Sequence, residues 1–384
     1  MKIPFGLPII DDKEKNAVLK VLSQPVLAHG KQTSEFEKKF TSFTKAKTSI
    51  STSSCTAGMH LFYMSIGLKK NDEVIMSSQT HVATAHAVEI MGGKPIFVDS
   101  DLETGNIDID KIEKKITKKT KVITVVHFLG IPVDMKKILK IAKKYNLFIL
   151  EDCALSVGTK IDNIHVGLWG DAGVFSFYPV KHMTTGEGGI IISKNLKLRK
   201  KIILSKSLGI NKNFLDRKTP GLYDCVMPGL NYRMSEINSA IGIQQLKKIN
   251  FFLKKRKNNF EYLFKELSTF KSLRILKSNS KRLASSNYCM TIILQKKQLY
   301  QNRTKIIKNL NKKGIGTSIY YPHSVPGMKY YKNKYNINLN EFKNAENIGN
   351  RSIAIPVGPH LGKKELDYIL INIKKILKID DKKN

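Results

Sequence analysis

FSFYPVKHMTTGEGG, residues 175–189, is the stretch that says most about the fold of this 384-residue chain. It begins inside an apolar run of the kind that forms strands buried on both faces of a sheet. Lys181 follows this run, beside threonines and glycines, and a lysine in such an apolar setting can form Schiff bases. Because the chain has 58 lysines, a solvated surface amine is the alternative interpretation.

On both sides of this stretch, short apolar runs alternate with helical stretches over the first 250 residues. Strands are predicted at Lys47–Thr52, Glu73–Ser77, Pro95–Asp99, Lys121–Val126, Leu147–Asp152, Ala172–Tyr178 and Gly189–Ser193. Helices are predicted at Asp11–Leu22, Ser34–Phe43, Thr56–Gly67, Asp134–Tyr145 and Leu196–Leu208. This alternation predicts an α/β fold with a mostly parallel, seven-stranded sheet that is flanked by helices on both faces.

The pattern changes near residue 251. Lysine-rich helices are predicted at Asn302–Lys313 and Lys363–Lys378, with short strands at Tyr288–Leu294 and Gly316–Tyr321. We therefore expect a large domain at residues 1–250 and a smaller C-terminal α+β domain at residues 251–384.

The charge of the chain is strongly basic, with 66 Lys plus Arg against 31 Asp plus Glu and a net charge of +35. Basic minus acidic residues give +14 for residues 1–250 and +21 for residues 251–384. Such a balance raises nucleic acid or an anionic membrane as a partner. However, only 8 of the 66 basic residues are Arg, the residue that nucleic-acid readers favour. A compositional bias explains the lysines better, and no nucleic-acid partner is expected.

Membrane spans and metal sites are not expected either. The longest apolar stretch, residues 122–133, is interrupted by polar and helix-breaking residues and is shorter than the roughly 18 residues of a span. The four cysteines lie far apart without CxxC spacing, which indicates neither a zinc site nor a disulfide framework. A cytoplasmic location fits this cysteine pattern best.

Two strand ends carry residues suited to ligands. Ser53-Ser54-Cys55-Thr56-Ala57-Gly58 opens a predicted helix, whose free N–H groups could hold a phosphate, although a simple Ser/Thr N-cap explains the pattern too. Glu151-Asp152 ends an apolar strand, where α/β sheets bind ligands. A carboxylate there could pair with a cationic ligand atom, and an acid that only caps a loop is the alternative.

Together, these segments resemble the DegT/DnrJ/StrS family of sugar aminotransferases, which use pyridoxal 5′-phosphate (PLP) on the fold-type I aminotransferase scaffold. The resemblance extends from Phe36-Glu37 to the region of Pro356 and is most specific at residues 175–189. Further matching segments are residues 71–75, 80–84, 98–99, 120–127, 151–152 and 229–234.

The resemblance implies roles for individual residues. Lys181 would form the Schiff base with the cofactor and move the proton at the substrate carbon. Asp152 would pair with the pyridinium nitrogen, and His81 would lie over the cofactor ring, where relatives place an aromatic residue. The cofactor phosphate would be held by Thr56, Ala57 and Ser176, and by Asn231 from the neighbouring subunit of a homodimer with shared active sites.

The match is incomplete at two positions, and the substrate side is less specific. Cys55 stands where relatives usually have Gly, and Leu155 stands where they carry Gln or His for the cofactor's phenolic oxygen. On the substrate side, the resemblance points to Arg233, Tyr321 and His323, with interdomain packing as the alternative role for the tyrosine.

The implied reaction is the transfer of an amino group from glutamate to a keto group of a nucleotide-activated deoxy sugar, with C4 favoured, for surface polysaccharide or glycan biosynthesis. One alternative is a lyase, because a few relatives replace the lysine by His and use the pyridoxamine cofactor to dehydrate a sugar. His182 lies beside Lys181 and does not replace it. A non-catalytic regulatory or polyanion-binding protein is a further alternative, which only the charge supports.

Overall fold

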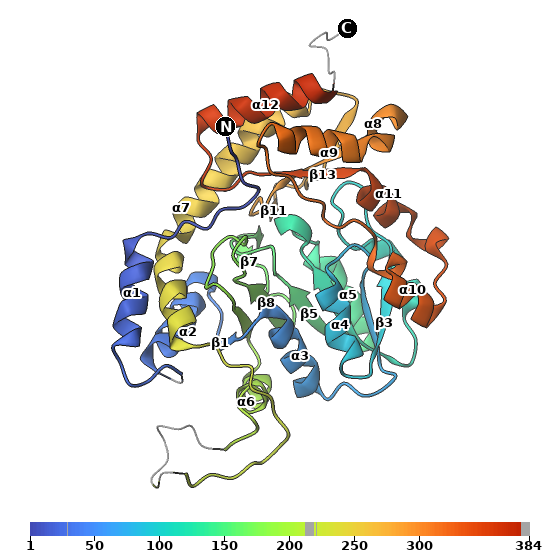
Figure 1. The fold of residues 1–384 in the computed structure, drawn as a ribbon. Helices are drawn as coiled ribbons and strands as arrows, with labels where there is room; N and C mark the ends of the chain where they lie inside the picture. Colours follow the sequence, from blue (N-terminus) through green and yellow to red (C-terminus); the bar gives the residue numbers. More distant parts are fainter. Residues whose placement is uncertain (29, 212–218, 220, 378–384) are drawn as a thin grey trace.

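The computed structural model describes residues 1–28, 30–211, 219 and 221–377, and its centre is a seven-stranded sheet in the order β1-β9-β8-β5-β4-β2-β3 (Figure 1). The strands are β1 (Thr48–Thr52), β2 (Glu73–Ser77), β3 (Lys94–Val98), β4 (Thr120–Val126), β5 (Phe148–Asp152), β8 (Ala172–Ser176) and β9 (Gly189–Ser193). Only β9 runs antiparallel to its neighbours, β1 and β8. The predicted fold class is confirmed, and every predicted strand of this sheet ends within two residues of the observed one.

Helices cover both faces of the sheet because its strands alternate apolar side chains between two cores. In β9, Ile190 and Ile192 enter one core and Ile191 enters the other. The first core is closed by α2 (Lys31–Thr44), α5 (Met135–Tyr145) and α7 (Glu236–Leu267), and the second by α3 (Cys55–Ile66), α4 (Val82–Glu89) and α6 (Leu196–Ser205). Helix α1 (Asp12–Leu22) packs against α7 (Figure 1).

The C-terminal part is built on a second sheet of three antiparallel strands, β10 (Leu273–Ile275), β12 (Met290–Leu294) and β13 (Ser352–Ile355). Its helices are α8 (Lys297–Gln301), α9 (Arg303–Lys312), α10 (Lys329–Tyr335), α11 (Lys343–Arg351) and α12 (Lys363–Leu377). A third small sheet joins β6 (Lys160–Ile161) and β7 (Ile164–His165) to β11 (Leu283–Ala284), and so links the two parts of the chain. Short 3-10 helices connect these elements, among them η1 (Ile109–Lys111), η2 (Glu113–Lys115), η3 (Phe128–Gly130), η5 (Val325–Gly327) and η6 (Leu339–Phe342).

Helix α7 runs without a break through the predicted domain boundary at residue 250. Its first half packs with α1 and α2, and its second half contributes Leu263 and Leu267 to the core of the C-terminal sheet. Ile3, near the N-terminus, pairs with Ile315 in the C-terminal part. The division into residues 1–250 and 251–384 therefore stays a prediction.

The prediction of a strand at Gly316–Tyr321 is wrong. Only Ser318 pairs there, through two backbone hydrogen bonds with Ala354 of 2.8 and 3.1 Å. The ladder stops because Tyr320 and Tyr321 turn their rings toward aromatic residues between the two parts of the chain, including Tyr288. Packing of these two rings outweighs the strand propensity of the segment.

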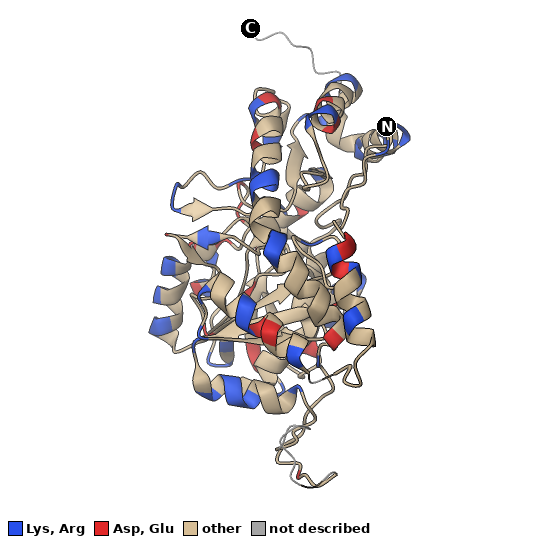
Figure 2. Cartoon of the chain, turned by 90° about the vertical axis from the view of Figure 1, so that its left-hand side faces the viewer, with Lys and Arg blue, Asp and Glu red and all other residues tan. Residues whose placement is uncertain are grey.

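The surface carries the basic surplus in a dispersed form. Figure 2 shows lysines and arginines on helices at the top, the side and the bottom of one face. Across the described ranges, no helix has both the length and the apolar character that crossing a membrane requires. The cytoplasmic location stays a prediction.

Candidate active site

Lys181 and Asp152 come together at the carboxyl ends of β5 and β8, next to the first turn of α3. Lys181 lies in the loop after β8, which turns through a 2.9 Å hydrogen bond from the Lys181 N–H to the Tyr178 carbonyl. Its side chain is partly buried, and its Nζ lies 5.6 Å from the centre of the Tyr288 ring. Burial lowers the pKa of the Lys181 amine, and the nearby Cys55 and Asp152 oppose this shift. A lowered pKa increases the share of the unprotonated amine, which is the form that attacks a carbonyl group.

Asp152 is held in one orientation by two hydrogen bonds. Its Oδ2 accepts from the Thr84 hydroxyl at 2.8 Å, and its Oδ1 accepts from the Ala154 N–H at 3.0 Å. The carboxylate is buried, with 5% of the residue exposed. Thr84, from α4, was not predicted as a site residue, although it lies in the matching segment at residues 80–84. It fixes the carboxylate that the sequence singled out.

The first turn of α3 forms a compact junction with the sheet. Ser54 is the N-cap of α3 and accepts from the Ala57 N–H at 3.1 Å, so the simple capping role is present. A Cβ on Gly189 would lie 2.5 Å from the Cys55 nitrogen, so β9 can approach this turn only through a glycine. Ser176 ends β8, which pairs with β9. The N-terminal N–H groups of α3 remain suited to an anion because a helix leaves them without intrahelical acceptors.

His81 begins α4 and lies against Tyr321. Its Nδ1 accepts the Ala83 N–H at 3.2 Å, and the two rings are 5.5 Å apart in an edge-on arrangement. The residue as a whole is exposed, but partial burial of its ring and the Lys181 amine lower the pKa of the imidazole. The ring is therefore neutral at neutral pH and can offer an uncharged flat face.

The remaining predicted residues lie in two other segments. Asn231 is exposed and accepts a 2.9 Å hydrogen bond from Arg233. Between them, the Tyr232 carbonyl accepts from the Ser53 N–H at 2.8 Å, so this loop lies beside the α3 junction. The structure thus brings Tyr321 to the Lys181 group through His81, whereas His323 is exposed two residues farther along.

Leu155 and Cys55 show how the two departures are accommodated. Leu155 is buried in an apolar cluster with Phe128 and Tyr288, so its side chain packs the boundary between the two parts of the chain. Cys55 is also buried, and burial together with Asp152 raises the pKa of its thiol well above the ordinary value. Neither side chain offers a hydrogen bond comparable to that of Gln or His.

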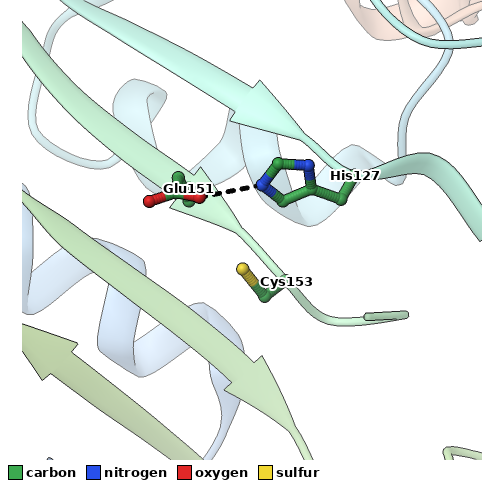
Figure 3. Close-up of side chains that lie close together, drawn as sticks. All are labelled: His127, Glu151 and Cys153. Carbon is green, nitrogen blue, oxygen red and sulfur yellow. Dashed lines mark hydrogen bonds and ion pairs between the residues drawn. The ribbon is translucent and has the colours of Figure 1, made fainter. Parts of the chain in front are cut away.

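Glu151, the second acid of the predicted pair, makes hydrogen bonds within the protein interior. Figure 3 shows it facing His127, with Cys153 nearby, on the ends of neighbouring strands. The carboxylate accepts from His127 Nε2 at 2.9 Å and from three backbone N–H groups, of Gly167, Trp169 and Gly170, at 2.7–2.8 Å. A histidine, a glutamate and a cysteine this close could ligate a metal. Because four donors already occupy the glutamate, we interpret the group as an internal hydrogen-bonded anchor.

The residues present fit a PLP molecule. A partly buried amine, a buried carboxylate in a fixed orientation and a helix N-terminus lie near one another, and their chemistry matches the aldehyde, the ring nitrogen and the phosphate of the cofactor.

Comparisons with known proteins agree with this geometry. The model of the DegT/DnrJ/EryC1/StrS aminotransferase family matches residues 8–374. GDP-perosamine synthase of Escherichia coli O157:H7 is 32% identical over 378 residues, covering 97% of this chain and 98% of the relative. The spore coat polysaccharide biosynthesis protein SpsC of Bacillus subtilis is 31% identical over 385 residues, covering 98% and 97%.

Solved structures are similar over the whole fold. PseC of Helicobacter pylori, an aminotransferase involved in the biosynthesis of pseudoaminic acid, has a TM-score of 0.92 at 28% identity, covering 98% of this chain and all of that one. The sugar aminotransferase Spr1654 of Streptococcus pneumoniae, in its PMP form, has a TM-score of 0.92 at 26% identity, covering 98% and 99%. The chain therefore belongs to the DegT/DnrJ/EryC1/StrS aminotransferase family, and it is a nucleotide-sugar aminotransferase whose cofactor is PLP.

Proposed function

We propose that this protein transfers the amino group of glutamate to a keto group of a nucleotide-activated deoxy sugar, with C4 as the favoured ring carbon. The observation that carries the proposal is the Lys181 amine, whose pKa is lowered by burial beside the fixed carboxylate of Asp152. The use of the product in a surface polysaccharide is supported by the B. subtilis relative, which is named for spore coat polysaccharide biosynthesis.

In the proposed mechanism, the bound cofactor supplies the electron sink that stabilises negative charge at the substrate carbon. Lys181 would hold the cofactor and would move the proton at that carbon. Asp152, oriented by Thr84, would hold the ring nitrogen in its protonated form through opposite charge. His81, with its neutral imidazole, would lie against the ring and shield it from water.

The phosphate end is proposed to lie at the first turn of α3, against Thr56, Ala57 and Ser176. We further propose that Asn231 reaches this phosphate from a second copy of the chain, as part of a homodimer. Its exposure and its place on a loop that contacts Ser53 support this role, because an exposed polar side chain is available to a partner.

On the sugar side, we propose roles for Arg233, Tyr321 and His323. Arg233 carries a charge that suits a diphosphate, and it belongs to the same loop as Asn231. Tyr321 packs on His81 and would border the space above the cofactor, and the exposed His323 would line its entrance.

A screen of UDP-, dTDP-, GDP- and CDP-linked keto sugars with glutamate and PLP tests the proposal, with products identified by mass spectrometry. An amine in place of an oxygen, together with 2-oxoglutarate, is the expected result. Loss of water alone would show the lyase alternative instead. Lys181→Ala should lose both the product and the visible absorbance of the lysine-bound cofactor. A wild-type protein that never turns yellow with PLP would contradict the assignment of Lys181.

A further inference from the structure

Arg256 is a buried cation beside the Tyr288 ring, which Lys181 also approaches. It projects from α7, only 5% of the residue is exposed, and its Nη1 donates to the Tyr288 carbonyl at 2.7 Å. Its guanidinium carbon lies 5.8 Å from the centre of the same Tyr288 ring that Lys181 Nζ approaches at 5.6 Å. Two cationic side chains thus share one aromatic ring, and their charges are no more than about 11 Å apart.

The surroundings of these two cations hold little compensating negative charge. The titratable or charged groups near Lys181 or Arg256 are Asp152, Cys55, His81, His182, Tyr288, Tyr320, Cys289 and His360. Asp152 is the one carboxylate in this set, and it lies on the Lys181 side. Burial lowers the pKa of the Arg256 guanidinium, but an arginine stays protonated at any ordinary pH.

A small pocket has both cationic residues in its lining. It measures about 10 Å³, and its lining includes Lys181, His182 and Arg256. A cavity of this size holds one water molecule. Arg256 and His182 each have a buried polar atom, Nε and Nδ1, with no hydrogen-bond partner among the described residues.

The chemistry of these two atoms suits a water molecule that bonds to both. His182 Nε2 lies 3.2 Å from the Ser286 carbonyl, which can only accept, so Nε2 carries the hydrogen and Nδ1 is an acceptor. Arg256 Nε is a donor. One water can accept from Arg256 and donate to His182, whereas a halide could not satisfy Nδ1. Burial and the Arg256 charge also lower the pKa of His182 well below its ordinary value, which keeps the ring neutral.

We propose that Arg256, together with His182 and one bound water, forms a positively charged group near Lys181, and that Arg256 is a positioning residue whose charge disfavours protonation of this amine. The inference rests on the role proposed above for Lys181. It gives α7 a role at the site, because α7 carries the Arg256 charge that acts on Lys181. At an effective dielectric of about 20, the repulsion between two charges about 11 Å apart lowers the pKa of the Lys181 amine by roughly one unit. A more polar interior would leave about half of this shift.

The test is the titration of Lys181 in the full-length, cofactor-free chain. Competitive labelling with acetic anhydride over a pH series, with the Lys181 peptide quantified by mass spectrometry, gives the pKa of this amine directly. Arg256→Met should raise it by roughly half to one unit, and Arg256→Lys, which keeps the charge, should leave it near the wild-type value. Arg351→Met, which removes a cation that stacks on Tyr300 in another part of the chain, is the matched control and should have no effect.

Equal Lys181 titration in Arg256→Met and wild type would overturn the proposal, and so would an equal shift in Arg256→Lys. If Arg256→Met does not fold, a high-resolution crystal structure of the wild-type protein decides, because one water bonded to Arg256 Nε and His182 Nδ1 is expected and a dry cavity refutes the proposed group. These readouts use no sugar and no cofactor, so they are independent of the substrate screen.

Discussion

Replacing Glu151 by Gln is expected to destabilise the fold strongly, although the two side chains have nearly the same shape. Glu151 is fully buried, and each of its oxygens accepts two hydrogen bonds: Oε1 from Trp169 and Gly170, and Oε2 from Gly167 and His127. A glutamine has one oxygen, and its NH₂ group cannot accept. Whichever way the amide is placed, two of the four donors lose their acceptor.

His127 cannot repair this mismatch without a further loss. Its Nδ1 accepts the Val133 N–H at 3.1 Å, so its Nε2 must carry the hydrogen that points at Glu151. If His127 moved its hydrogen to Nδ1, this N–H would face the Val133 N–H, and the bond between them would be lost. A buried donor left without an acceptor costs about 1–3 kcal/mol. Two such donors give about 2–6 kcal/mol, a large share of the about 5–15 kcal/mol by which domains are stable.

Urea unfolding, followed by fluorescence and circular dichroism, measures this free energy. We expect a loss of about 4 kcal/mol for Glu151→Gln. Glu35→Gln is the matched control: Glu35 is half exposed and pairs with Lys39 on the surface of α2, so its loss should cost less than about 0.5 kcal/mol. A Glu151→Gln protein within about 1 kcal/mol of wild type would refute the reasoning. A comparable destabilisation of wild type by EDTA would show instead that His127, Glu151 and Cys153 hold a metal.

Three further changes probe the site and its support. Thr84→Val removes the hydroxyl that donates to Asp152 at 2.8 Å, and because a hydrogen bond to a charged group contributes about 1.5–3 kcal/mol, PLP affinity measured by absorbance titration should fall roughly 10- to 100-fold. Gly189→Ala places a Cβ 2.4 Å from the Ser54 carbonyl carbon, so unfolding should show a loss of about 1–3 kcal/mol together with weaker PLP binding. Burial lowers the pKa of His165 to about 4, so the unfolded chain takes up a proton between pH 6.5 and 4 that the native state does not. The free energy of unfolding should therefore fall by up to about 3 kcal/mol over this range, and His165→Gln should flatten the pH dependence; an unchanged slope would contradict it.

The strands of the central sheet could be predicted because they are buried on both faces. A run such as Gly189–Ser193 is continuously apolar since neighbouring residues enter different cores. The same reasoning failed at Gly316–Tyr321, where aromatic side chains serve a different purpose. Tyr320 and Tyr321 pack between the two parts of the chain, and a residue-by-residue pattern does not contain that distant surface.

The site could be predicted where its residues follow one another in the chain. Lys181 and the Ser54–Ala57 turn stand in local segments that allowed ordinary alternatives by themselves, and only the family resemblance assigned their roles, which stay predictions. Thr84 is 68 residues away from the Asp152 carboxylate that it orients, and a threonine near the start of a helix has an ordinary capping explanation. Tyr288 and Arg256 approach Lys181 only because the C-terminal part folds onto the large sheet. Their types and neighbours in sequence carry no signal of this approach.

The net charge of +35 does not indicate which basic residues affect the chemistry, because burial determines the distance over which a charge interacts with other groups. An exposed lysine such as Lys257 is surrounded by water and salt, which screen its field within about 10 Å. Arg256 is its neighbour in sequence but points inward from α7, where the dielectric is low and no carboxylate of the described residues is paired with it. On the proposal above, its field at Lys181 is reduced by the protein interior but not by salt and bulk water. Removing Lys257 would change the total charge by the same amount as removing Arg256, yet only the second change is expected to move the titration of Lys181, the proposed catalytic amine.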